Sequence, residues 1–323
     1  MFEIQMAKAA KKIVEQLAGV QPGEKVLIVT DTGSDFSLAH SLASAVEAAG
    51  GEFAIIIAKP VAKAGDSPHA CIGAAASSAD VILTPTSRSI THSQGIRDAL
   101  KAGKARLLSL SEAKPRTFVG GMFEADFLSR KPLVEALGRK MAEGRNIKIQ
   151  APGGTDLVAD LGTRVPILNT ALSHKPGQNM GSAIEVFIAP IEGSMNGTFV
   201  CDITCSMIGI VAQPVRIQFK DGVAVSIEGG AEAARLKELL AGVGDPGAYW
   251  NAEIAFGLNP CARVTGDIIE DEGKYGTGHV ALGNNLGFGG KLTAAIHIDM
   301  VYSKPSVWID GEQVYRDGEL LIK

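Results

Sequence analysis

The sequence predicts two domains: an α/β domain with a doubly wound parallel sheet over residues 1–150, and an α+β domain with a mainly antiparallel sheet over residues 151–323. In the first part, short apolar runs alternate with helical stretches, which is typical of parallel sheets covered on both faces. Beyond residue 150, helices become rare and strand-like segments between turn residues dominate. A chain of 323 residues is also longer than one typical domain.

The strands expected in the parallel sheet are short apolar runs, which are typical of fully buried strands. They are KVLIVT (25–30), EFAIIIA (52–58), DVILTP (80–85), RLLSL (106–110) and NIKIQ (146–150). Helical stretches separate them, such as residues 34–49, which end at a pair of glycines, a usual helix stop. The first residues, MFEIQMAKAAKKIVEQLAG, predict an amphipathic helix of mixed charge rather than a signal peptide.

Composition excludes several classes of function. The formal net charge of −4 gives no reason to expect nucleic acid or an anionic membrane as a partner. No apolar run approaches the length of about 18 residues that would span a bilayer. The cysteines lack CxxC spacing and predict reduced, buried thiols: Cys71, Cys201, Cys205 and Cys261. We therefore expect a cytoplasmic globular protein. We further expect a homodimer that acts on a small molecule or a peptide, which composition alone does not indicate.

The second half is read as strands and hairpins joined by turns. The expected strands are 182–190, 196–205, 214–219, 223–229 and 304–315, the last with an Asp-Gly turn. One helix, over residues 231–240, interrupts them. This pattern predicts a mainly antiparallel sheet.

No nucleotide-binding fingerprint accompanies the parallel sheet. The turn after the first strand, TDTGSDFS, lacks G-x-G-x-x-G. The stretch GNNLGFGGKLT (283–293) resembles a phosphate loop, but Leu292 replaces the required Ser or Thr, so we expect an ordinary loop. In SITHSQG, Thr91 and His92 follow the third strand, where ligands of open α/β sheets gather. His92 is a candidate substrate contact, and the alternative is that Thr91 or Ser93 caps the next helix.

The stretch KLTAAIHIDMVYSK (291–304) carries the most informative pattern. Read as a strand, it places Ile296, Ile298 and Met300 on one face. His297 and Asp299 share the other face, inside an otherwise apolar run where an unpaired charge costs several kcal/mol. They can form a simple ion pair, or they can converge on one metal ion.

Three further ionisable residues interrupt apolar strands in the same half: Glu185, Glu253 and His279. A divalent cation commonly compensates several buried carboxylates. Three carboxylates and two imidazoles exceed what one tetrahedral ion takes and suit two ions. The chain has no HExxH, GxSxG or catalytic cysteine signature that would compete with this interpretation.

These residues carry a family resemblance. The stretches EVFIAPIEGSMNGTFV, AEIAFGLNP, IIEDEGKYGTGHVALG and HIDMVYSKPSVWIDGE resemble the thermophilic aminopeptidases of the T and S type. The resemblance implies a two-metal site in which Glu185, Glu253, His279, His297 and Asp299 are ligands. The family also has a tyrosine seven residues after the first of these histidines, where this chain has Leu286.

The same stretches are also similar to a relative of that family, 2,5-dihydroxypyridine 5,6-dioxygenase, a ring-opening enzyme that uses one Fe(II). Its ligands are two histidines and an aspartate. His297 and Asp299 match two of them, Glu253 stands in place of the other histidine, and the dioxygenase has no equivalent of His279. The ligand set therefore resembles the hydrolase more closely.

Our main expectation is a metal-dependent hydrolase that cleaves a peptide or small amide bond with water activated by two ions of Zn, Co or Mn. The alternatives are a mononuclear Fe(II) ring-cleaving dioxygenase and a ligand-binding protein without catalysis. We expect the site in a cleft between the two halves, with His92 on its wall. With five residues committed to metal, the sequence identifies no general base.

Overall fold

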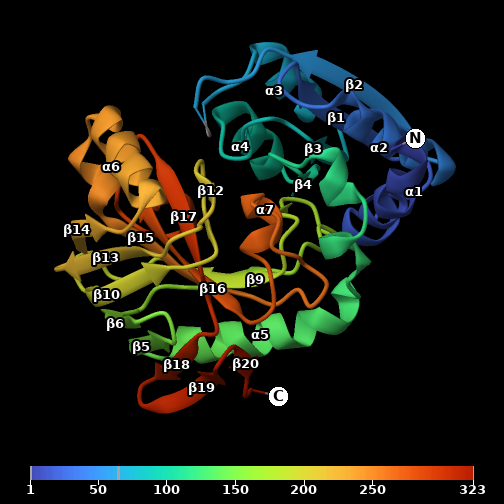
Figure 1. The fold of residues 1–323 in the computed structure, drawn as a ribbon. Helices are drawn as coiled ribbons and strands as arrows, with labels where there is room; N and C mark the ends of the chain where they lie inside the picture. Colours follow the sequence, from blue (N-terminus) through green and yellow to red (C-terminus); the bar gives the residue numbers. More distant parts are fainter. Residues whose placement is uncertain (1, 64–65, 323) are drawn as a thin grey trace. The chain divides into compact units, whose positions relative to one another are not determined.

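The computed structural model describes residues 2–63 and 66–322 and divides the chain into two compact units. The first unit runs to Phe127 and also takes residues 169–183, whereas the second comprises residues 128–168 and 184–323 (Figure 1). The chain thus passes between the units three times, although we expected one boundary near residue 150. Within the described ranges, no helix is both long and apolar enough to cross a membrane. The homodimer and the cytoplasmic location remain predictions.

The first unit contains the expected parallel sheet. Its strands, in the spatial order β2-β1-β3-β4-β8, are β2 (Glu52–Ala58), β1 (Lys25–Asp31), β3 (Val81–Thr84), β4 (Arg106–Ser109) and β8 (Asn179–Met180). Every neighbouring pair is parallel. Four of the five predicted apolar runs form four of these strands. The fifth strand has two residues only and comes from the segment 169–183.

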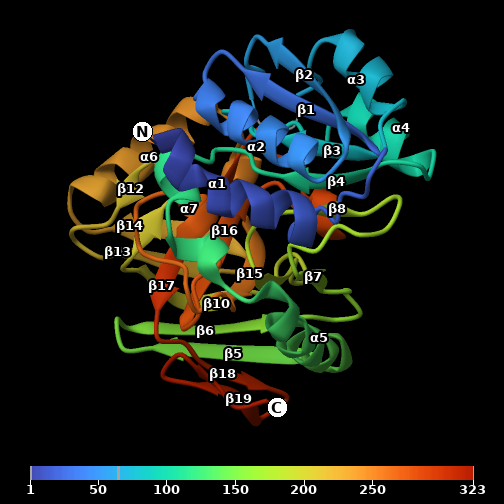
Figure 2. The same cartoon turned by 90° about the vertical axis from the view of Figure 1, so that its right-hand side faces the viewer.

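Helices cover both faces of this sheet, which makes it doubly wound. Helices α1 (Phe2–Lys12) and α2 (Phe36–Ala48) pack on each other and lie side by side in Figure 2; α1 continues as a π-helical turn, η1 (Ile13–Leu17). Helices α3 (Ala70–Ala76) and α4 (Gln94–Lys101) pack against Leu27, Val29 and Ile82 on the opposite face. Two 3-10 turns, η2 (Pro115–Phe118) and η3 (Gly121–Glu124), follow the sheet.

The second unit contains two antiparallel sheets. The eight-stranded sheet has the order β14 (Val223–Glu228), β13 (Val215–Lys220), β10 (Asn196–Cys201), β6 (Thr155–Asp160), β5 (Asn146–Ala151), β18 (Ser306–Ile309), β19 (Glu312–Arg316) and β20 (Glu319–Leu320). The seven-stranded sheet has the order β12 (Gly209–Ile210), β11 (Thr204–Cys205), β17 (His297–Ser303), β16 (Thr277–Gly283), β15 (Asn251–Gly257), β9 (Glu185–Ile188) and β7 (Ile167–Asn169).

One apolar face of the seven-stranded sheet packs on the eight-stranded sheet. Tyr302 of β17 meets Phe199 of β10 edge to face with ring centroids 5.5 Å apart, and Phe256 of β15 stacks on Tyr315 of β19 at 5.2 Å. All four rings are buried. Because side chains alternate along a strand, every second residue of β15, β16 and β17 projects from the opposite face, away from this aromatic core.

The helices of the second unit are α5 (Phe127–Glu143), which begins at the boundary of the first unit, α6 (Ala231–Val243) and α7 (Ile268–Asp271). Two 3-10 turns, η4 (Pro246–Tyr249) and η5 (Leu286–Phe288), precede β15 and β17. The expected Asp-Gly hairpin is present, with positive φ at both Asp310 and Gly311, as a type I′ turn requires. Of the cysteines, only Cys201 and Cys205 are buried; Cys71 is exposed and Cys261 is partly exposed.

One strand assignment is wrong. We expected residues 146–150 to be the fifth strand of the parallel sheet, but β5 pairs antiparallel with β6 and β18 in the second unit. Ile147 and Ile149 are buried while Asn146 and Lys148 are exposed. This alternation belongs to a strand with one solvated face, whereas strands of covered parallel sheets are apolar on both faces.

A buried arginine fixes the amino end of the parallel sheet. Arg106, at the start of β4, donates from Nε to the carbonyl of Ala18 at 2.8 Å and from Nη2 to the carbonyl of Gly19 at 2.9 Å. The same guanidinium holds both carboxylate oxygens of Glu24, at 2.8 and 2.7 Å. The Arg106 side chain is 6% exposed, so water can do little to solvate its charge. The guanidinium therefore relies on Glu24 and the two carbonyls for its hydrogen bonds and for charge compensation.

We predict that Arg106→Leu lowers the free energy of unfolding by about 2–4 kcal/mol, because it removes a buried guanidinium that donates to two carbonyls and to the partly buried carboxylate of Glu24. The matched control is Lys104→Gln, which removes the exposed ion pair between Lys104 and Asp80. That change should cost less than about 1 kcal/mol. Urea unfolding of both variants measures the difference, and equal losses would contradict the role of Arg106.

Candidate metal centre

The strand register places the predicted ligands of β16 and β17 on one face. His297 and Asp299 lie two residues apart on β17, and Val301 continues their face. His279 of β16 is paired with Val301. Residues paired across an antiparallel ladder project to the same side, so His279 shares the face of His297 and Asp299.

Glu253 and Glu185 extend the same row across the sheet. Glu253 of β15 is paired with Ala281, which in turn is paired with Asp299. Glu185 of β9 is paired with Gly257 of β15, four residues along from Glu253. The small residues between the ionisable ones leave room for the longer side chains to lean toward each other. The five residues are therefore on one face, opposite the aromatic core.

Four of the five side chains are in contact. The His297 Nε2 lies 3.1 Å from Asp299 Oδ1 and 3.4 Å from Glu253 Oε2. The His279 Nε2 lies 3.2 Å from Glu253 Oε1 and 3.9 Å from Asp299 Oδ1. Ligand atoms of Glu253, His297 and Asp299 all lie within 4.8 Å of one another, which makes these three a possible metal site. We call these four residues the carboxylate–histidine cluster.

Glu185 takes part through its charge. It is buried, and its carboxylate is one of the charges that raise the pKa of His279. The structure places it on the same face as the cluster but does not include it in the group of three converging ligand atoms. Its role as a ligand remains a prediction.

Mutual contacts decide the protonation of the cluster. Burial favours the neutral imidazole of His279, but the hydrogen bond to Glu253 and the charges of Asp299 and Glu253 raise its pKa to about 9. Burial likewise opposes the charge on His297, and Asp299 and Glu253 raise its pKa. Burial alone would raise the pKa of each carboxyl group. Hydrogen bonds from the two histidines instead lower the pKa of Glu253, and the charge of His297 lowers the pKa of Asp299. Without metal, protons on the imidazoles compensate the carboxylates.

A backbone contact orients His297. Its Nδ1 lies 2.8 Å from the carbonyl of Asn284, which can only accept, so Nδ1 is the donor and carries a proton. In the neutral ring this leaves the lone pair of Nε2 pointing at Glu253 and Asp299. An outer hydrogen bond of this kind is the usual support of a metal-binding histidine.

The segment that follows β16 is built around Asn285, which is fully buried. The side chain of Asn285 accepts from the backbone of Leu292 at 2.8 Å, and its amide lies 3.4 Å from Glu192, which also accepts from the backbone of Lys291. At Gly290, a Cβ would lie 1.9 Å from the Asn285 side chain, so only glycine fits. We call residues 284–292 the asparagine loop; it is the ordinary loop predicted in place of a phosphate loop.

The asparagine loop carries an aromatic side chain to the cluster. The ring of Phe288 meets His297 edge to face at 5.6 Å and Phe187 at 5.6 Å. Phe187 is paired with Ala255 on β15 and shares the face of Glu253. Both phenylalanines are partly exposed, so they form an apolar wall beside the cluster. Neither was singled out from the sequence, because a phenylalanine in a strand or loop normally predicts core packing.

Two other positions singled out from the sequence, His92 and Leu286, are not among the four residues of the carboxylate–histidine cluster. His92 is exposed in the loop between β3 and α4, eight residues beyond the end of β3, and its carbonyl accepts from Arg97 at 2.6 Å. It belongs to the first unit, so its approach to the cluster remains a prediction. Leu286, at the position of the family tyrosine, begins η5 and is 51% exposed.

Comparison with known proteins gives one family over nearly the whole chain. The model of the NicX family, described as 2,5-dihydroxypyridine 5,6-dioxygenase, matches residues 5–322. A curated 2,5-dihydroxypyridine 5,6-dioxygenase from Pseudomonas putida is 23% identical over 245 residues, which cover 72% of this chain and 69% of that protein.

Two solved structures share the fold. A 2,5-dihydroxypyridine dioxygenase from Pseudomonas putida superposes with a TM-score of 0.82 at 20% identity, over 99% of this chain and 97% of the other. Wild-type AmpT from Thermus thermophilus gives a TM-score of 0.74 at 15% identity, over the full length of both chains. At these identities the two structures support the fold alone.

The expectation of a peptide- or amide-cleaving hydrolase is wrong, because the family match and the curated relative favour the dioxygenase that we had placed second. The expectation of two ions also lacks support, since the possible metal site in the described residues comprises one group of three. The two ions were expected because five ligand types were counted together, whereas only Glu253, His297 and Asp299 bring ligand atoms into one group. The chain belongs to the NicX family, the family of 2,5-dihydroxypyridine 5,6-dioxygenase.

Proposed function

We propose that this protein is a ring-cleaving dioxygenase that opens a hydroxylated nitrogen-containing aromatic ring with one Fe(II). The observation that carries the proposal is the convergence of Glu253, His297 and Asp299 beside the aromatic wall of Phe187 and Phe288. The family match over residues 5–322 supports the same chemistry. The substrate class is taken from the name of the family and of its curated relative.

The geometry and chemistry of the three residues fit one divalent ion. Ligand atoms at about 2.1 Å from an ion, at right angles to one another, lie about 3 Å apart. The separations of His297 Nε2 from Asp299 and Glu253, 3.1 and 3.4 Å, are close to this value. Three adjacent ligands occupy one face of an octahedron and leave the opposite positions for other molecules.

The ligand set differs from the usual one of such iron sites. The common facial triad has two histidines and one carboxylate, whereas this group has one histidine and two carboxylates. The second imidazole, that of His279, is present but contacts Glu253 at 3.2 Å and is not part of the converging group. We propose that His279 orients Glu253 and holds a proton beside the substrate.

The bound iron would supply the activation of dioxygen, and both oxygen atoms would enter the ring-opened product. The protein would orient the ring: the partly exposed side chains of Phe187 and Phe288 offer an apolar surface that a planar ring can contact. The Asn284 carbonyl would hold His297 in the orientation that ligation needs. The buried face of the sheet keeps bulk water from Glu253 and His279, which are 5% and 2% exposed.

The function is tested with protein loaded anaerobically with Fe(II) and then supplied with oxygen and a panel of dihydroxypyridines and dihydroxybenzenes. We expect uptake of one oxygen molecule per ring opened, and loss of both metal and turnover in Asp299→Asn. The matched control is Asp156→Asn, an exposed aspartate of β6, which should behave as the wild type. Metal-dependent turnover that proceeds without oxygen would overturn the proposal.

We predict that metal binding releases protons and strengthens with pH. In the metal-free protein both histidines have raised pKa values, that of His279 to about 9, so they are protonated at neutral pH. A cation must displace the proton of His297, which should raise the affinity about tenfold per pH unit for each proton displaced. Calorimetric titration with Mn(II) between pH 6.5 and 8.5, in two buffers, counts these protons.

In His279→Gln the number of protons released to metal should stay near one, because His297 is the ligand that gives up its proton and His279 keeps its own. Affinity that is independent of pH in this range, with no proton release, would show that the imidazoles do not face the metal.

We predict that Phe288→Ala raises KM for the aromatic substrate about tenfold, because an aromatic contact contributes about 0.5–1.5 kcal/mol beyond its buried area. Phe288→Tyr keeps the ring and should stay within about threefold of the wild type. Steady-state kinetics with measured iron content separate this effect from loss of metal. If Phe288→Ala changes neither KM nor kcat, the ring does not contact the substrate.

A further inference from the structure

We propose a second ligand site in the first unit: a pocket at the carboxyl edge of the parallel sheet that binds a small anion, a carboxylate or phosphate carried on an apolar body. It is a cavity of about 710 Å³, and none of its lining residues belongs to the carboxylate–histidine cluster. Its volume lies within the usual range for small-molecule sites.

Topology puts the pocket where an open parallel sheet binds ligands. The spatial order β2-β1-β3-β4-β8 reverses direction between β1 and β3. The pocket is lined by Gly33, which follows β1, by residues 59–62, which follow β2, and by Ser87 and Arg88, which follow β3. In sheets of this order, ligands bind outside the carboxyl ends of the strands at the reversal point.

Two of the loops that line the pocket are held together by hydrogen bonds to one carboxylate. The buried carboxylate of Asp31 accepts from the backbone of Gly33 at 2.9 Å and of Ser87 at 2.8 Å, which ties the loops after β1 and β3 together. At Gly33 a Cβ would lie 2.7 Å from the Ser87 hydroxyl, so glycine allows this close approach. The Asp31 carboxylate is therefore occupied by the backbone amides of the two loops.

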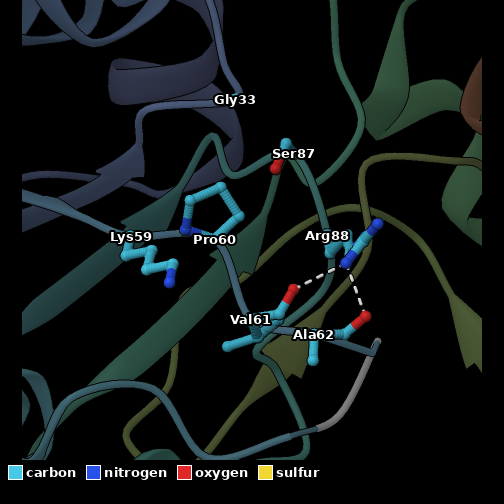
Figure 3. Close-up of a pocket in the computed structure, with 7 residues that line it drawn as sticks. All are labelled: Gly33, Lys59, Pro60, Val61, Ala62, Ser87 and Arg88. Atoms are coloured by element: carbon cyan, nitrogen blue, oxygen red, sulfur yellow. Dashed lines mark hydrogen bonds between the residues drawn. The ribbon is translucent and has the colours of Figure 1, made fainter.

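Two cations stand at the rim, on either side of Pro60 in Figure 3: Lys59 and Arg88. Arg88 is oriented by its Nη1, which donates to the carbonyl of Val61 at 2.8 Å and also to that of Ala62. Among the contacts of the described residues, its remaining N–H groups and the Lys59 ammonium have no carboxylate partner. Pre-oriented guanidinium groups favour carboxylates and phosphates.

The helix that follows β1 does not supply the anion site. The first turn of α2 is capped by Asp35, whose carboxylate accepts from the backbone and the hydroxyl of Ser37. A carboxylate already lies where a phosphate would bind in a nucleotide-binding sheet. The anionic group of the ligand would therefore be bound by Lys59 and Arg88. Pro60, Val61 and Ala62 would contact the apolar part of the ligand.

The test is calorimetric binding of benzoate and phenyl phosphate to the full chain, with benzyl alcohol as the uncharged analogue. We expect saturable binding of at least one anionic probe at or below about 10 mM, and weaker binding of the alcohol. Lys59→Gln and Arg88→Gln should each weaken binding about tenfold. Lys101→Gln removes the same charge from the last turn of α4 and should have no effect.

Lys59→Gln is the decisive variant, because Lys59 has no structural contact among the described residues, whereas Arg88 also supports the segment 61–62. The preference between benzoate and phenyl phosphate assigns the anionic group. Binding must persist after chelation and in Asp299→Asn. Binding that disappears in either case, that ignores Lys59→Gln, or that is absent for both anions overturns the proposal.

Discussion

The second unit depends on mutual compensation of buried charges on one face of the seven-stranded sheet. The opposite face is committed to an aromatic core, so the charges of the clustered carboxylates and imidazoles are compensated mainly by one another or by a cation. In the metal-free protein the lowered carboxyl pKa values stabilise the fold above about pH 4, and this stability is lost as pH falls. The raised imidazole pKa values stabilise it below about pH 6.5, and the contribution of His279 is lost as pH rises through about 9.

The asparagine loop connects this electrostatic requirement to recognition. One side chain, Asn285, fixes the loop backbone, and the loop in turn provides the carbonyl that orients His297 and the ring of Phe288. Metal ligation and the apolar wall therefore share one support. A side chain at Gly290 would place its Cβ 1.9 Å from the Asn285 side chain, so this change would disturb both the orientation of His297 and the position of Phe288.

The sequence predicted the face on which the site lies because a strand has a fixed period of two. His297 and Asp299 were separated from Ile298 and Met300 by that rule alone, and the register confirms it. The sequence did not predict which of the five candidate ligands converge, because convergence depends on the directions of side chains on neighbouring strands. The resemblance named two chemistries, and the wrong one was preferred because residue types were counted without knowing that His279 leans on Glu253.

The fold was predictable where patterns are long. Four strands of the parallel sheet follow from their apolar runs, whereas β8 has two residues and no signal that could be read. The segment 146–150 was assigned to the wrong sheet, although its alternation of exposed and buried residues was visible. Phe288 was missed because its role depends on a loop held by Asn285, a contact between residues that no short motif describes.

The two-residue strand β8 has a consequence for synthesis of the chain. It completes the parallel sheet by pairing with β4, yet it is encoded after the two first strands of the other unit, β5 and β6. As the chain leaves the ribosome, the edge of β4 has formed long before the residues that cover it exist. An uncovered edge strand is a template for pairing with other chains. During synthesis, β4 therefore lacks its outer neighbour until residues 179–180 have been made, and over this interval its free edge can pair with other chains.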